Sequence, residues 1–374
     1  MNKTLKIGKN ILFCGGGTGG SVTPLLAVAE ELWHENQGFD QKLIFVGNYD
    51  GPEREMVAAF NANIGKMKYI PLISGKWRRY FSLQNFFDIF KIIIAYFQSF
   101  SLLRREQPGL IVSAGGFISV PLVWAAATKK IPILIHQQDV RAGLANKLMA
   151  PFARVVTVTF EKSLLDYGIK AIWIGNPVKQ LSLADQELKI EAIKNKYSLL
   201  ESKPLVLVVG GGTGSAAINN LIFRAASELS EFCQLLHLTG SGKLPSNING
   251  SDYYRIREIV THQDILELMM AAEVVVSRCG LASLTELSAL NKPAILIPIP
   301  KSHQEDNAAV FSRAEAAIVL NQNELTSEKL TVEIKRILND ATLKEKLKNN
   351  ISKVIKKGAT QNLTGIIEEI LSRN

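Results

Sequence analysis

Two stretches of this chain share one order of elements: an apolar strand, a glycine-rich turn and the start of a helix. The first is Ile11-Leu-Phe-Cys-Gly-Gly-Gly-Thr-Gly-Gly20, and the second is Leu205-Val-Leu-Val-Val-Gly-Gly-Gly-Thr-Gly-Ser215. Glycines let a backbone approach a ligand closely, and a helix N-terminus offers free N–H groups and a partial positive charge, which suits phosphate. A single turn of this kind is a weak signal, but the repeat predicts an α/β protein with two Rossmann-like domains facing each other across a cleft.

Composition narrows the class of protein. The 374 residues are enough for two domains with their own cores, and the net charge of +9 favours an anionic partner. We expect no nucleic-acid partner, because the sequence has no zinc-finger spacing, RNA-binding signature or basic arm. We also expect no cofactor and no metal site, since the three cysteines follow no metal spacing and no Asp-x-Asp pair occurs. Neither a signal peptide nor an apolar run of roughly 18–20 residues is evident.

Apolar runs alternate with helical patterns in both halves of the chain. In the first half, strands are predicted at 43–47, 110–113, 132–136 and 154–158, with helices at 53–60 and 121–128. In the second half, a helix at 185–196 precedes strands at 205–209, 233–238, 258–260, 274–277 and 294–297. This alternation predicts parallel sheets covered on both faces. We expect an N-terminal domain over 1–165, a C-terminal domain over 175–350, and a last helix over 351–374 that could cross back to the first domain.

The segment 81–103 carries bulky apolar residues at helical spacing, and basic residues precede, interrupt and follow it. One interpretation is a core helix. The other is a helix that dips into the membrane interface while basic residues meet anionic headgroups. Asp88 and Lys91 argue against a membrane-spanning helix. The basic residues are Lys76, Arg78, Arg79, Lys91, Arg104 and Arg105.

The segment Ser277–Glu286 follows a predicted strand and opens a helix. Its turn glycine, its hydroxyls and the helix N-terminus could hold a diphosphate, and Glu286 could accept hydrogen bonds from both hydroxyls of a ribose. The alternative is an ordinary first-turn acid stabilised by the helix dipole. A polar cluster at 303–307 follows the next strand, where open α/β sheets bind ligands.

A third glycine turn, Ser113–Pro121, follows a strand in the first half, and His136 ends the next strand close to Asp139. A lone histidine is more often structural than catalytic, but its place at a strand's carboxyl end next to Asp139 keeps both interpretations open. A dinucleotide-binding alternative is poorly supported, because Asp50 comes late for an acid that would hold an adenosine ribose.

Taken in order, these motifs resemble the MurG family of glycosyltransferases over nearly the whole chain. The motifs are Gly16–Gly20, Ala114–Ser119, His136–Asp139 with Asn146, Gly175–Lys179, Gly210–Gly214, Arg278–Glu286 and His303–Ala308. The resemblance implies a two-domain GT-B fold and an inverting, metal-independent transfer of N-acetylglucosamine from its UDP sugar. The implied acceptor is the undecaprenyl-diphosphate muramyl-pentapeptide lipid, lipid I, and the product is lipid II for peptidoglycan. A peripheral protein on the cytoplasmic face of the membrane is implied, with possible cell-wall synthesis proteins as partners.

The resemblance also implies two sets of binding residues. The donor set is Lys179, Gly212, Thr213, Gly214, His262, Arg278, Leu281, Ala282, Ser283, Leu284, Thr285, Glu286, His303, Gln304 and Asn307. The acceptor set, around the lipid-linked diphosphate, is Thr18, Gly19, Gly20, Ser21, Gly116, Phe117, Ser119 and Asn146. Lys179 stands where the family usually has an arginine, so the charge is kept and the bidentate fork is lost.

Two departures from the family pattern bear on the mechanism. Ser21 stands where the family has a histidine, and Gln137 stands where it has a glutamate. An inverting transfer needs a base for the attacking hydroxyl, so Asp139 and His136 are the predicted catalytic residues. The departures leave two alternatives open: a related lipid glycosyltransferase with a diacylglycerol acceptor, and a non-catalytic binding protein with the same fold.

Overall fold

The computed structural model of the chain describes residues 9–17, 19–35, 42–73, 75, 83–179, 186–200 and 202–373. Of the predicted residues, Thr18 and the basic residues at 76–79 lie outside this set. The chain divides into two compact units: unit 1 comprises residues 1–179 and 356–374, and unit 2 comprises residues 180–355.

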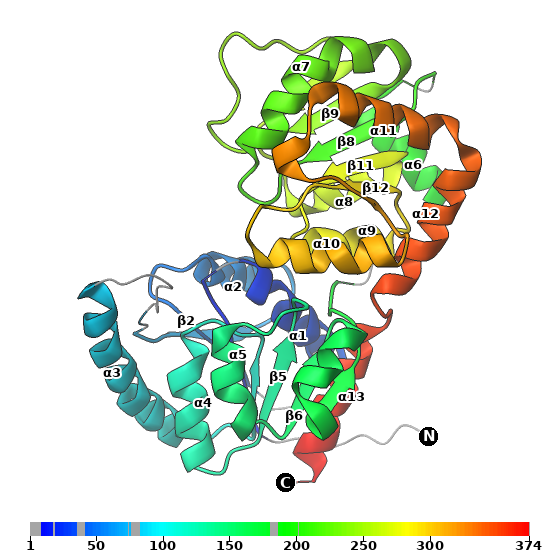
Figure 1. Ribbon diagram of the computed structural model, residues 1–374. Coiled ribbons are helices and arrows are strands. Elements are labelled where there is room, and N and C mark those ends of the chain that lie inside the picture. Colours follow the sequence, from blue (N-terminus) through cyan, green and yellow to red (C-terminus); the bar gives the residue numbers. More distant parts are fainter. Residues whose placement is uncertain are drawn as a thin grey trace. The chain divides into compact units, whose positions relative to one another are not determined.

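Unit 1 is built on a parallel sheet of seven strands in the order β3-β2-β1-β4-β5-β6-β7. Figure 1 labels β2, β5 and β6 of this sheet. The central strand β1 pairs with β2 on one side and β4 on the other, and its Ile11 lies opposite Leu43 and Leu110. The glycine loop after β1 therefore leaves the sheet at the carboxyl ends of these parallel strands. The strand order reverses between β1 and β4, which is where open α/β sheets bind ligands. The strands are β1 (Ile11–Cys14), β2 (Leu43–Gly47), β3 (Met67–Pro71), β4 (Leu110–Ser113), β5 (Ile133–Gln137), β6 (Val155–Val158) and β7 (Ala171–Trp173).

Alternate residues of the strands bury opposite faces of this sheet. Ile11 and Phe13 pack with residues of α1 (Thr23–Glu35), α2 (Pro52–Asn63) and α13 (Ala359–Ser372). Leu12 and Cys14 pack with residues of α3 (Leu83–Glu106), α4 (Ser119–Thr128) and α5 (Leu144–Met149). The last helix of the chain thus completes one face of unit 1, where it packs beside α1.

Unit 2 has a parallel sheet of six strands in the order β10-β9-β8-β11-β12-β13. The order reverses between β8 and β11, so the glycine loop after β8 also lies at a switch point. Its strands are β8 (Leu205–Val209), β9 (Gln234–Leu238), β10 (Tyr254–Arg257), β11 (Val274–Ser277), β12 (Ala294–Leu296) and β13 (Ile318–Val319).

Seven helices of unit 2 surround this sheet in the part of the chain that the structure describes. Val206 and Val208 pack against apolar residues of α7 and α11 to form one side of the core. The helices are α6 (Gln186–Lys196), α7 (Ala216–Phe232), α8 (His262–Ala271), α9 (Leu281–Ala289), α10 (His303–Arg313), α11 (Ser327–Asn339) and α12 (Ala341–Val354).

The structure confirms the predicted pair of Rossmann-like domains and most of the predicted strands. The strand expected at 258–260 is wrong, because β10 ends at Arg257 and the Glu258 carboxylate instead accepts a hydrogen bond from the N–H of Gly242 at 3.0 Å. Four strands lie outside the predicted ranges: β3, β7, β10 and β13. Each lies at the edge of a sheet or is only two residues long, so its apolar signal is weak.

Each unit buries one neutral histidine. His136 in unit 1 and His237 in unit 2 are fully buried, and burial lowers the pKa of each to about 4. The ring nitrogens of His237 lie 2.9 Å from the Tyr254 hydroxyl and 3.0 Å from the Asn219 side-chain oxygen. Because burial disfavours the charged ring, His237 takes up a proton at a lower pH in the folded protein than in the unfolded chain.

We therefore expect both units to lose stability as the pH falls below the ordinary histidine pKa. Between pH 6.5 and about 4 the unfolded chain binds a proton at each of these positions and the folded chain does not. The free energy of unfolding should then fall by up to ~1.4 kcal/mol per pH unit for each histidine. Urea unfolding at pH 7.5 and pH 5.5 measures this slope. His237→Gln should flatten it, and an equally steep loss in the variant would contradict the assignment.

Candidate active site

In unit 1 the first glycine loop rests against the third glycine turn. Gly116 has φ +92°, and a Cβ at this position would lie 2.7 Å from the carbonyl oxygen of Gly16. A side chain there would separate the two turns, so glycine is required. Ser21 closes the first loop by donating its hydroxyl to the Gly16 carbonyl at 3.2 Å.

Ser119 and Asn146, which were predicted to bind the acceptor lipid, both contact Gly115 of the third glycine turn. The buried Ser119 hydroxyl lies 3.0 Å from the Gly115 carbonyl oxygen and 3.2 Å from the Cys14 sulfur. Asn146, also buried, places its side-chain oxygen against Gly115, and this oxygen has no hydrogen-bond partner among the described residues. Ser119 therefore shapes the turn, whereas Asn146 places a buried acceptor without a partner beside it.

The His136 side chain is enclosed by polar partners. Its Nδ1 lies 3.1 Å from the Thr157 hydroxyl, and its Nε2 lies 3.1 Å from the Asn176 side-chain oxygen. With both nitrogens engaged and the ring fully buried, this imidazole is suited to hold β5, β6 and the 175–178 segment together. It is poorly suited to take a proton from a bound hydroxyl.

Gln137 organises the loop that follows β5. Its Nε2 donates to the carbonyl oxygens of Asp139 at 2.6 Å and Arg141 at 3.3 Å. Its Oε1 accepts from the Asn146 amide at 2.6 Å and from the Tyr167 hydroxyl at 3.0 Å. All four contacts fix the path of the backbone through Asp139.

The same loop contacts the first glycine loop. Gln138 donates its side-chain amide to the Gly20 carbonyl at 2.7 Å, next to Ser21. The half-buried Asp139 follows in the chain. The structure therefore brings the predicted acid of unit 1 to the same edge of the sheet as the predicted phosphate loop.

In unit 2 the loop after β8 leads directly into α7. Gly212 and Thr213 form its exposed tip, and Ser215 caps the helix by accepting a hydrogen bond from the N–H of Ile218 at 3.4 Å. The first N–H groups of a helix of this length form an anion-binding site. The start of α7 therefore has the geometry that an anion-binding helix N-terminus requires.

Arg278 lies behind this loop and is used by the protein itself. Its guanidinium donates to the carbonyl of Ile297 at 3.0 Å, to the Ser215 hydroxyl at 2.6 Å and to the side-chain oxygen of Gln322 at 2.6 Å. Arg278 is only 7% exposed, so its charge lies beneath the loop. Its hydrogen bonds connect Ser215, the cap of α7, to the segments that follow β12 and β13.

The turn between β11 and α9 is held by the start of α10. The Gln304 side-chain oxygen accepts from the N–H groups of Cys279 at 3.3 Å and Ile299 at 3.2 Å. The Asn307 amide donates to the Cys279 carbonyl at 3.2 Å. This arrangement leaves the Gln304 Nε2 beside Gly280, at the N-terminus of α9. His303 begins α10 and is exposed.

Glu286 lies one turn into α9 and faces His262 at the start of α8. Its Oε1 is 3.6 Å from the His262 Nε2, and burial raises the pKa of this carboxyl to about 8. A buried carboxyl with little internal hydrogen bonding is available to a ligand hydroxyl. On the same helix Leu281, Leu284 and Thr285 are buried, and the Thr285 hydroxyl donates to the Leu281 carbonyl at 2.8 Å. Ala282 and Ser283 reach the surface.

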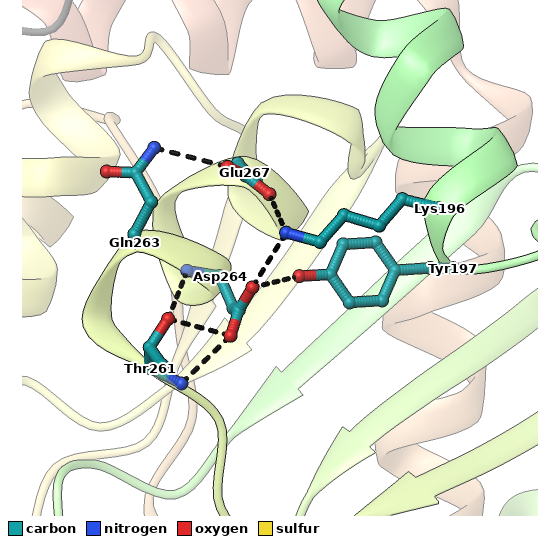
Figure 2. A network of polar contacts seen from close by, with 6 residues as sticks. All are labelled: Lys196, Tyr197, Thr261, Gln263, Asp264 and Glu267. Carbon is teal, nitrogen blue, oxygen red and sulfur yellow. Dashed lines mark hydrogen bonds and ion pairs between the residues drawn. The ribbon is translucent and has the colours of Figure 1, made fainter.

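A polar network fixes the start of α8 and with it His262 (Figure 2). The Asp264 carboxylate accepts from the Thr261 N–H at 3.0 Å, while the Thr261 hydroxyl accepts from the Asp264 N–H at 3.2 Å, forming a capping box. From α6 and the residue after it, Lys196 lies 2.9 Å and the Tyr197 hydroxyl 2.5 Å from the same carboxylate. These hydrogen bonds hold the pKa of Asp264 well below its usual range.

Lys179, predicted at the donor diphosphate, is paired with Glu30 of α1 in unit 1 at 2.8 Å. Its side chain is 60% exposed, so the pair is weak and a stronger anion can compete for the ammonium. Within the described ranges no three histidine, cysteine or acidic side chains gather closely enough to hold a metal ion.

Comparison with known proteins covers both units. The glycosyltransferase family 28 N-terminal domain matches residues 11–158, and the corresponding C-terminal domain matches residues 205–363. A UDP-N-acetylglucosamine–N-acetylmuramyl-(pentapeptide) pyrophosphoryl-undecaprenol N-acetylglucosamine transferase of Clostridium botulinum is 34% identical over 366 residues, 96% of this chain and 99% of that protein. The transferase of the same name from Clostridium kluyveri is 36% identical over 334 residues, 88% and 91% of the two chains.

A solved structure agrees on the fold. MurG of Acinetobacter baumannii superposes with a TM-score of 0.73 at 21% identity, over 96% of this chain and 99% of that one. With both domains matched and the relatives covered almost from end to end, this chain belongs to glycosyltransferase family 28 and is a two-domain glycosyltransferase of the GT-B type.

Proposed function

We propose that this protein transfers N-acetylglucosamine from UDP-N-acetylglucosamine to an undecaprenyl-diphosphate-linked muramyl pentapeptide. The observation that carries this proposal is the end-to-end likeness to transferases with that name, at 34–36% identity. The two glycine loops support it, because each lies at the switch point of its own sheet, where a phosphate group could bind.

Unit 2 would bind the donor. The start of α7 and the 210–214 loop would hold the diphosphate, and Glu286 would accept hydrogen bonds from the ribose hydroxyls. Binding of a diol would favour the ionised carboxylate, so Glu286 would lose its proton as the nucleotide binds. Gln304 of α10, whose Nε2 lies beside Gly280, would contact the sugar, and His262 would border the base.

Unit 1 would bind the lipid-linked diphosphate at the first glycine loop and the Gly115–Gly116 turn. In the reaction the acceptor hydroxyl would attack the anomeric carbon, the bond from that carbon to UDP would break, and the hydroxyl proton would pass to a base. Asp139 suits this role better than His136, because the imidazole is buried with both nitrogens engaged. His136 would then act by positioning β5 and its loop.

The helix α3 supports a place at a membrane surface. Its inner side chains Ala95, Leu102 and Leu103 are buried in the core, whereas Phe90 and Phe97 are 53% and 66% exposed. Ile93, Ile94 and Phe100 continue the exposed apolar face at helical spacing. No helix in the described ranges is long and apolar enough to cross a bilayer.

Basic side chains gather where this helix ends. A hollow at the C-terminal end of α3 is lined by Lys9, Arg104, Arg105, Lys129 and Lys130, with Glu106 as its acid. Lys129 also lies 4.3 Å from the centre of the Phe100 ring, so the apolar face and the basic hollow are continuous. An apolar helix face beside clustered cations suits an anionic bilayer surface.

A transfer assay tests the function. Radiolabelled UDP-N-acetylglucosamine is offered with vesicles containing lipid I or diacylglycerol, with and without magnesium. We expect label in lipid I alone, at equal rates with and without the metal ion. Label in diacylglycerol would favour the related lipid glycosyltransferase, and UDP binding without transfer to either lipid would favour a non-catalytic protein.

Asp139→Asn tests the proposed base. The amide cannot take the proton, so kcat should fall by about 10²–10⁴-fold while the KM for UDP-N-acetylglucosamine stays within about twofold. Asp252→Asn, an exposed aspartate of unit 2 before β10, is the matched control and should behave like the wild type. Near-normal turnover of the Asp139 variant would show that another group takes the proton.

Replacing two exposed phenylalanines tests the membrane surface. The double variant Phe90→Ser/Phe97→Ser loses two aromatic rings that could insert into the bilayer interface. Its affinity for phosphatidylglycerol vesicles, measured by co-sedimentation, should fall by at least about tenfold. UDP binding should not change. Val332→Ser removes a 62% exposed apolar residue from α11 and should sediment like the wild type. Undiminished vesicle binding by the double variant would exclude this face.

A further inference from the structure

Lys243, which the sequence motifs do not include, holds the glycine loop of unit 2. It follows β9, and its ammonium donates to the carbonyl oxygens of Thr213 at 2.8 Å and Gly214 at 2.9 Å. The lysine is itself anchored, because its N–H donates to the Gly240 carbonyl at 3.2 Å. The preceding N–H, of Gly242, donates to the Glu258 carboxylate.

The two loops also touch through their backbones. A Cβ on Gly214, at φ +73°, would collide with the carbonyl oxygen of Thr239. A Cβ on Gly240, at φ +87°, would lie 2.5 Å from the carbonyl oxygen of Thr213. Since β8 and β9 are neighbours in the sheet, these glycines allow the two turns to pack as one rigid piece beside α7.

The lysine also changes the electrostatics of the loop. Exposed carbonyl oxygens would repel a diphosphate, and in a trans peptide the C=O and N–H groups point in opposite directions. Because the carbonyls of Thr213 and Gly214 accept from the Lys243 ammonium, their partial negative charges lie against a positive group. An ammonium has three N–H groups, and only two have partners among the residues that the structure describes.

We propose that Lys243 is a positioning residue for the diphosphate of the nucleotide donor. It fixes the 210–214 loop in the shape that exposes the N-terminus of α7, and it adds a full positive charge to that site. The ligand class is a nucleoside diphosphate, and the effect should follow the phosphates and leave the nucleoside unaffected. This inference rests on the proposed donor site of unit 2.

Binding of UDP, UMP and uridine to the full chain tests the proposal by calorimetry. Lys243→Gln keeps a hydrogen-bond donor but removes the charge. The variant should therefore bind UDP about 10–100-fold more weakly than the wild type, with a smaller loss of affinity for UMP and none for uridine. Lys243→Arg should restore most of the UDP affinity. Lys203 is the matched control, since its ammonium also donates to two carbonyls, those of Ser230 and Glu231. Lys203→Gln should bind all three ligands like the wild type.

Unchanged UDP binding by Lys243→Gln, or an equal loss for uridine, would overturn the inference. Absence of UDP binding by the wild type would instead overturn the proposed function. Acetylation of the wild-type chain gives a second measurement that does not depend on a variant folding. UDP should slow acetic anhydride labelling of Lys243 and not of Lys203, as read by mass spectrometry, and equal protection of the two lysines would contradict the proposal.

Discussion

Backbone-to-backbone contact between glycine turns is the constraint on which both candidate sites depend. In unit 1 Gly116 packs on Gly16, and in unit 2 Gly214 packs on Gly240. All these turns leave the carboxyl ends of neighbouring parallel strands, about 4.8 Å apart in any sheet. At Gly116, Gly214 and Gly240 a side chain would collide with a carbonyl oxygen of the neighbouring turn, and φ is positive at all three. The glycines are therefore required for the turns to pack at the carboxyl edge of each sheet, whether or not a ligand binds there.

Many polar residues of the motifs serve that construction. Hydrogen bonds to backbone carbonyls or neighbouring side chains are made by Ser119, Arg278 and Thr285. Both ring nitrogens of His136 also have hydrogen-bond partners within the protein. Buried polar groups without partners cost free energy, so a site that must expose a few polar atoms needs many others to hold its turns. Glu286 is the contrasting case, because its burial with little internal hydrogen bonding raises its pKa and leaves it suited to a ligand.

The fold was largely predictable because strands buried on both faces are continuous apolar runs, as in Leu205–Val209. The edge strand Met67–Pro71 is buried only at Met67 and carries no such run, and the polar segment Tyr254–Arg257 carries none either. In the site, residues that follow a strand within one motif were predictable. The roles of Lys243 and Gln138 were not predictable, because each contacts a loop that is distant along the chain. Lys243 lies 30 residues from its partner Thr213, and Gln138 lies 118 residues from Gly20. Only the order of strands brings such partners together.

Gln137 shows why one departure from the family pattern need not abolish the site. Two carbonyl oxygens lie on one side of its amide, and two donors, from Asn146 and Tyr167, lie on the other. A carboxylate here would satisfy the two donors but would face the two carbonyls with no proton to give, at a cost of ~1–3 kcal/mol. In this chain the amide at position 137 therefore shapes the loop, because it holds the backbone carbonyls of Asp139 and Arg141 while Asn146 and Tyr167 hold its own oxygen. The path of the backbone that carries the half-buried Asp139 thus depends on a neutral side chain at position 137.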